Sequence, residues 1–200
     1  MNALSKEIYK IAPGKPFTVV MLRELASYAN VRQTLSRLAK TGEITRISRG
    51  IFVRPKKIPY LGKVLPESRS IVDVIAKKSG ETIATHGAEA ARILQLSTQV
   101  PMKSIYYTTG STRRIKIENH EIILKHISAR KIVLPGTVVG LVISALWYLG
   151  KNHVNNAVIE KIRERVTRKQ FYELLKQTIK MPAWMADFFY QYKQEKTYAK

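Results

Sequence analysis

The 200-residue sequence has no cysteine and few acidic residues. Without cysteine, disulfides, thiolate metal sites and cysteine nucleophiles are excluded. Its two aspartates, Asp73 and Asp187, lie too far apart in the sequence to suggest a carboxylate pair that holds a catalytic metal ion. The sequence therefore predicts neither a metal site nor a cofactor and no catalytic residues, and we expect a protein that is not an enzyme.

A long uninterrupted apolar segment is also lacking. Residues 132–150 carry no charge, but Pro135 and Gly136 break the run. A helix over 137–149 would rise only about 20 Å, whereas the hydrocarbon core of a bilayer is about 30 Å thick. We therefore expect a buried core helix and no membrane partner. Residues 1–12 mix charged and apolar side chains, which does not suit an export signal and favours a cytoplasmic protein.

Lysine and arginine greatly outnumber aspartate and glutamate. The chain has 35 Lys and Arg against 14 Asp and Glu, a formal net charge of +21. Residues 1–57 contribute a net +9 and residues 58–200 a net +12, so both parts are basic. Such an excess favours a polyanionic partner, with nucleic acid as the first candidate and an anionic membrane surface as the second. The alternative is a basic surface that is simply solvated.

The spacing of apolar residues in the N-terminal part predicts three helices followed by a hairpin. The predicted elements are a helix over 3–11, a short helix after Thr18, a helix over 31–40 that Asn30 caps, and two strands within 43–54 around a turn at 48–50. This order is typical of a winged helix-turn-helix, in which the third helix enters the major groove of DNA and the hairpin, or wing, contacts the flanking backbone.

Polar side chains on the third helix and the wing are the candidate DNA-binding residues. Arg32 and Gln33 lie at the start of the helix, where arginine can pair with guanine and glutamine with adenine. The residues suited to phosphate contact are Thr34, Ser36, Arg37, Lys40, Arg46, Ser48, Arg49, Arg54, Lys56 and Lys57. Two alternatives stay open: a charged solvated face, and a winged helix that contacts only proteins.

Three prolines and a glycine within residues 55–66 indicate a linker and a domain boundary near residue 60. We predict a DNA-binding domain over 1–58 and an α+β domain over 64–200, whose C-terminal helices begin near 137. The second domain is expected to hold helices over 68–78, 87–96, 137–149, 154–166, 168–179 and 182–194, with strands over 104–108, 114–117, 121–124 and 131–134. The predicted fold class is α+β.

Two motifs in the second domain resemble catalytic motifs but lack residues that the catalysis needs. His86 begins a His-Gly-Ala-Glu stretch that lacks the second histidine of a zinc protease helix, so a cap or a packed core residue is the simpler interpretation. Gly110 and Ser111 follow a predicted strand, as in nucleotidyltransferases. Arg113 and Arg114 come next, however, where those enzymes need aspartates.

Several segments together resemble the type IV toxin-antitoxin antitoxins of the abortive-infection AbiEi family. They are residues 35–44 and 47–52 in the first domain, and 85–91 (THGAEAA), 99–101 (QVP), 107–114 (YTTGSTRR) and 145–150 (ALWYLG) in the second. The resemblance covers most of the chain and becomes loose after about residue 152.

The resemblance implies a protein that represses its own operon through the N-terminal domain, usually at inverted repeats in the promoter. Its C-terminal domain would counter a cognate nucleotidyltransferase-like toxin, directly or indirectly. Arg113, Arg114 and Lys116 would then lie on a second basic surface, which either makes a further contact with DNA or RNA or is simply solvated. The alternative is a stand-alone winged-helix regulator whose second domain mediates oligomerisation or protein binding.

Overall fold

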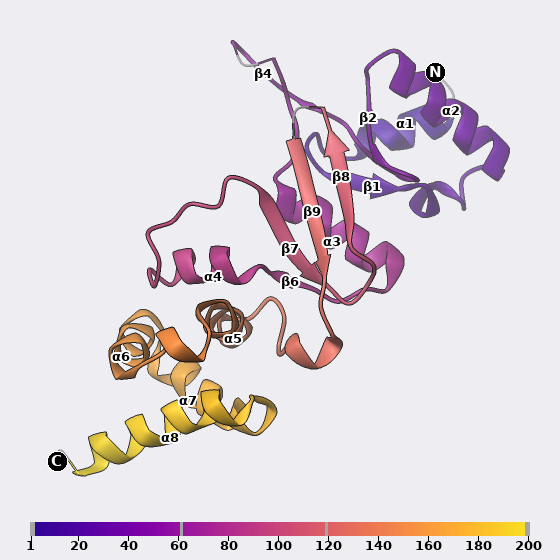
Figure 1. Ribbon diagram of the computed structural model, residues 1–200. Helices are drawn as coiled ribbons and strands as arrows, with labels where there is room; N and C mark the ends of the chain where they lie inside the picture. Colours follow the sequence, from indigo (N-terminus) through magenta and orange to yellow (C-terminus); the bar gives the residue numbers. More distant parts are fainter. Residues whose placement is uncertain (1–2, 61, 119, 199–200) are drawn as a thin grey trace. The chain divides into compact units, whose positions relative to one another are not determined.

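The computed structural model describes residues 3–60, 62–118 and 120–198, and it confirms the α+β class (Figure 1). The chain divides into two compact units. Unit 1 comprises Met1–Glu81 and Arg114–Ile122, and unit 2 comprises Thr82–Arg113 and Ile123–Lys200. The boundary predicted near residue 60 falls inside unit 1.

Unit 1 begins with two helices and a small antiparallel sheet. Its first elements are α1 (Ala3–Lys10), β1 (Pro16–Thr18), the 3-10 helix η1 (Val19–Leu22), α2 (Tyr28–Lys40), β2 (Thr45–Ser48) and β3 (Ile51–Val53). The three strands are ordered β1-β3-β2. One core joins the apolar faces of these elements, formed by Leu4, Ile8, Phe17, Leu22, Val31, Leu35, Leu38, Ile44 and Phe52.

The second and third helices differ from the prediction. The short helix expected after Thr18 is a single 3-10 turn. The third begins at Tyr28 and not at Val31, because Ser27 caps it and Asn30 lies in its first turn, where its backbone N–H donates to the Ser27 Oγ at 3.4 Å.

The described residues of the segment predicted to be a linker belong to unit 1 and include two strands. They form the antiparallel hairpin β4 (Lys56–Ile58) and β5 (Gly62–Val64), and α3 (Ser68–Ser79) follows. Tyr60 and Gly62 adopt positive φ, which allows the chain to reverse within a few residues. The Lys63 Nζ donates to the carbonyl oxygen of Gly42 at 3.0 Å and so joins this hairpin to the end of α2.

Strands β6 (Ile83–Thr85), β7 (Ser104–Thr108), β8 (Arg113–Ile117) and β9 (His120–His126) form a four-stranded sheet in the order β6-β7-β9-β8. The strand predicted over 131–134 is wrong. Residues 129–131 form the 3-10 helix η2, and Leu134 has a φ of 42°, which a strand does not allow. The apolar run that suggested a strand reaches the helical core through Val133.

Most of unit 2 is helical, and Figure 1 shows α5 to α8 gathered at the C-terminal end. The elements are α4 (Gly87–Ile93), α5 (Val138–Leu149), η3 (Lys151–His153), α6 (Asn156–Arg165), α7 (Arg168–Lys176), η4 (Gln177–Lys180) and α8 (Ala183–Tyr198). The apolar α5 packs in their common core, as predicted. A capping box between Thr167 and Gln170 begins α7, where the sequence predicts a helix from residue 168.

Candidate nucleic-acid interface

Helix α2 turns an apolar stripe to the core and a polar stripe to the surface. Val31, Leu35 and Leu38 are buried at spacings of four and three residues, the period of one helix face. The opposite side exposes Arg32, Gln33, Ser36, Arg37 and Lys40, all predicted candidates. Thr34 is 6% exposed and faces inward, so we leave it out of the surface proposed below.

The β2–β3 hairpin presents two arginines beside α2. Successive strand residues face opposite sides, so Ile47 is buried while Arg46 is exposed, and the register shifts between Arg46 and Ser48. Gly50, with a φ of 73°, completes the tight turn that leaves Arg49 exposed at the tip. Ser48 is partly buried beside them.

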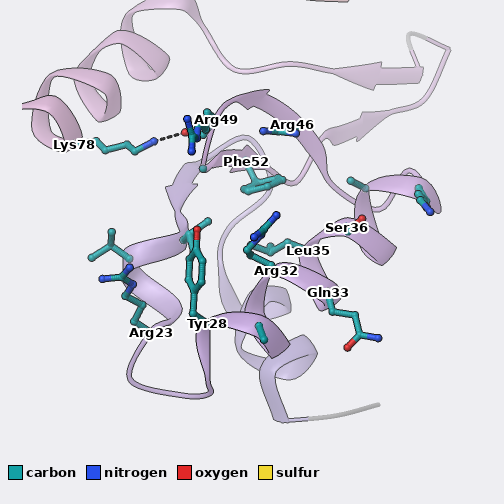
Figure 2. Close-up of a pocket in the computed structure, with 16 residues that line it drawn as sticks. Arg23, Tyr28, Arg32, Gln33, Leu35, Ser36, Arg46, Arg49, Phe52 and Lys78 are labelled. Atoms are coloured by element: carbon teal, nitrogen blue, oxygen red, sulfur yellow. Dashed lines mark hydrogen bonds between the residues drawn. The ribbon is translucent and has the colours of Figure 1, made fainter.

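A groove of about 970 Å³ runs between α2 and this hairpin, and all its lining residues belong to unit 1 (Figure 2). Its basic lining residues are Arg23, Arg32, Lys40, Arg46, Arg49 and Lys78. None of the described residues that line the groove is acidic. Because like charges repel at short range, this arrangement favours an anionic ligand.

Sequence reasoning missed Arg23, Tyr28 and Lys78 among the residues that line the groove. Arg23 follows the 3-10 turn, Tyr28 begins α2 before the predicted start of that helix, and Lys78 lies on α3, beyond the predicted domain boundary. The Lys78 Nζ donates to the carbonyl oxygen of Arg49 and so braces the tip of the hairpin (Figure 2). Only the folded arrangement brings α3 to the hairpin, so no local signal in the sequence pointed to Lys78.

Tyr28 stacks with two arginines at the mouth of the groove. The guanidinium carbon of Arg23 lies 5.3 Å from the centre of the Tyr28 ring, and that of Arg32 lies 5.7 Å from it. Figure 2 shows the two arginines on either side of the ring, whereas Gln33 points away from it. Tyr28 itself is 53% exposed.

The remaining candidates of the first domain lie outside the groove lining. The Arg54 Nη1 donates to the carbonyl oxygens of Tyr9 and Ile11 at 2.5 and 2.7 Å, and its guanidinium stacks on the Tyr9 ring. Arg54 thus satisfies carbonyl groups at the end of α1. Lys56 and Lys57 are exposed on β4.

The candidates for a second basic surface lie at or near β8. The Arg113 Nη1 donates to the carbonyl oxygen of Ser111 at 3.0 Å. Arg114 and Lys116 are exposed, and the Arg114 Nη1 lies 3.9 Å from a carboxylate oxygen of Glu121. Arg113 falls in unit 2 and the other two in unit 1. A second nucleic-acid contact here stays a prediction.

His86 is a helix cap in a packed aromatic setting, as the simpler interpretation predicted. Its Nδ1 accepts the backbone N–H of Ala88 at 3.3 Å, and its ring lies 4.7 Å from that of Tyr107 and 6.2 Å from that of Tyr148. Burial, with the nearby Lys125 charge, lowers the pKa of His86, and burial raises the pKa of Tyr107.

Within the described residues, no group of three or more His, Cys, Asp or Glu side chains is arranged to hold a metal ion. Across the same residues, no helix combines the length and apolar character needed to cross a bilayer.

Residues 4–174 match the model of a family described as a family of unknown function (DUF6088). The chain belongs to this family. No curated protein and no solved structure gives a significant match. Since the family's description assigns no activity, the resemblance to the AbiEi antitoxins and the absence of enzymatic activity stay predictions.

Proposed function

We propose that unit 1 is a winged helix-turn-helix that binds double-stranded DNA sequence-specifically and represses transcription. The observation that carries this proposal is the groove between α2 and the β2–β3 hairpin, with six basic side chains and no described acidic one in its lining. A phosphate backbone neutralises such a cluster and releases its counterions, which contributes much of the affinity.

In this proposal the exposed side of α2 enters the major groove and the hairpin tip contacts the flanking backbone. Gln33 and Ser36, which are exposed and uncharged, suit hydrogen bonds to base edges. Arg37 and Lys40 on α2, with Arg46 and Arg49 on the hairpin, suit phosphate oxygens.

The test is fluorescence anisotropy on a labelled duplex from the region upstream of the chain's own reading frame. A scrambled duplex of the same composition measures preference. We expect tighter binding to the upstream duplex and affinity that falls steeply with KCl concentration. R46E/R49E should weaken binding by roughly 100-fold at low salt, since it reverses two of the proposed phosphate contacts.

The matched control is K6E/K15E, which changes the net charge equally at exposed lysines outside the groove lining. It should weaken binding far less, because Lys6 and Lys15 are not among the proposed phosphate contacts. Equal losses in both variants, or no binding by the parent protein, would contradict the proposal.

We further propose, from the resemblance described above, that the chain is an antitoxin that represses its own operon and counters a nucleotidyltransferase-like toxin. Co-expression with the adjacent open reading frame tests this. Rescue of growth is expected when that product is toxic alone. A harmless product, or toxicity that the chain does not relieve, would favour the stand-alone regulator.

A further inference from the structure

We infer that Tyr28 positions Arg23 and Arg32 as a clamp for the phosphates of one DNA strand. Arg32 then contacts the backbone, and base edges are left to Gln33 and the residues beyond it on α2. This inference rests on the proposed DNA binding, and it replaces the base-reading role that the sequence suggested for Arg32.

The stack restricts the side chains of both arginines, which line the groove with Tyr28. With guanidinium carbons 5.3 and 5.7 Å from the ring centre, both groups lie within cation–π range of Tyr28. A stacked guanidinium keeps its N–H edge free, and that edge matches two phosphate oxygens at once. Holding the side chains in place beforehand also reduces the entropy lost on binding.

The direction of Arg32 separates it from the base-reading side of the helix. Successive helical residues are turned by about 100° around the helix axis, so Arg32 and Gln33 project in different directions. Figure 2 shows Arg32 directed into the groove, toward the side of Phe52 and the hairpin, and Gln33 directed away from it.

The charge of the surroundings favours a phosphate over a base. Arg46, Arg49 and Lys78 line the same groove as the stacked pair. A base edge offers hydrogen-bonding groups but no net charge, whereas a phosphate offers a full negative charge to the cluster. Placing the backbone here therefore relieves the repulsion among these cations.

The experiment measures affinity for the upstream and scrambled duplexes over a series of KCl concentrations. R23A and R32A should each weaken both duplexes by the same factor and reduce the slope of log affinity against log salt by about 0.9. Q33A should reduce the preference for the upstream duplex while keeping the slope. K6A, outside the groove lining, should change neither quantity.

Tyr28 is tested with two substitutions. Y28L removes the ring and should weaken both duplexes by roughly two- to five-fold, the value of an exposed cation–π contact. Y28F keeps the ring and should bind like the parent protein, which a role for the hydroxyl group would not allow.

The outcomes separate the two proposals. Loss of preference in R32A with an unchanged salt slope, or Y28L binding as tightly as the parent protein, overturns the clamp while DNA binding stands. A parent protein that binds neither duplex overturns both.

Discussion

The two units differ in whether their characteristic residues are exposed or packed. In unit 1, six basic side chains on and near α2 and the β2–β3 hairpin are exposed and line a groove. In unit 2, residues 85–91, which are part of the sequence resemblance to the AbiEi antitoxins, include a closely packed glycine. A Cβ on Gly87 would lie 2.4 Å from the Tyr148 Cβ and 2.6 Å from the Ser144 carbonyl oxygen. A distinctive sequence motif can thus reflect close packing, whereas the groove proposed to bind DNA is lined by basic residues that form no distinctive motif.

The largest stability effect should come from G87A. Ser144 O is backbone and Tyr148 Cβ is next to backbone, so neither can move aside without shifting α5, and we expect a loss of about 3 kcal/mol in the free energy of unfolding. Urea unfolding followed by circular dichroism measures it. The control is G80A, where the added Cβ meets nothing within 4 Å and only the strain of a left-handed backbone, with φ 68° and ψ 16°, is expected, about 1 kcal/mol. Equal losses would show that packing is not the cause.

The second largest loss in the free energy of unfolding should come from R54A, which tests whether a basic residue of unit 1 has a structural role. Removing the guanidinium leaves the carbonyl groups of Tyr9 and Ile11 without their donor, which should cost about 2 kcal/mol. K56A, at an exposed position on β4, should cost almost nothing. If R54A instead unfolds like the parent protein and loses DNA affinity, the phosphate contact first predicted for Arg54 is the better account.

A smaller, pH-dependent effect is expected from His86. Because its pKa is lowered in the folded protein, the unfolded chain binds more protons, so stability should fall as the pH drops through the ordinary histidine value of 6.5. The fall should stop below the folded pKa. H86N keeps a capping side chain without titrating and should reduce this dependence, measured by thermal unfolding between pH 5 and 8. H120N, at an exposed histidine, is the control, and the same reduction there would contradict the assignment.

The smallest stability effect should belong to the groove. R46E/R49E alters exposed side chains that pack against no core, so the free energy of unfolding should change by less than about 0.5 kcal/mol. A larger loss in urea unfolding would mean that weakened DNA binding by this variant reflects damage to the fold. The basic residues of unit 1 would then contribute to stability, as the packed residues of unit 2 do.

Regular periodicity made much of the fold predictable. Apolar spacing located α1, α2 and the helices of unit 2, and the glycine turn located the β2–β3 hairpin. The predictions that failed concern segments held by contacts distant in the sequence. Prolines around β4 and β5 suggested a linker, whereas Lys63 joins this hairpin to Gly42 at the end of α2. The apolar residues 131–134 suggested a strand, whereas Val133 packs against the helical core.

The site was predictable only in part, for the same reason. Helical spacing correctly predicted an exposed face with Arg32, Gln33, Ser36, Arg37 and Lys40. The same spacing places Thr34 on the inward face with Val31, so it could have excluded Thr34 from the candidate DNA-binding residues. Lys78 reaches the hairpin from a helix about 30 residues further along the chain, bonded to the Arg49 carbonyl. Tyr28 gains its role only once both arginines lie against its ring.

Unit 1 is assembled from two separated stretches, Met1–Glu81 and Arg114–Ile122. A single truncation cannot release it whole, since a fragment ending at residue 58 would discard β5 and α3 with Lys63 and Lys78. Even a fragment ending at residue 81 would lack the second stretch. Deletion experiments on this chain would therefore confuse loss of a domain with partial unfolding, and single-residue substitutions are the cleaner tool.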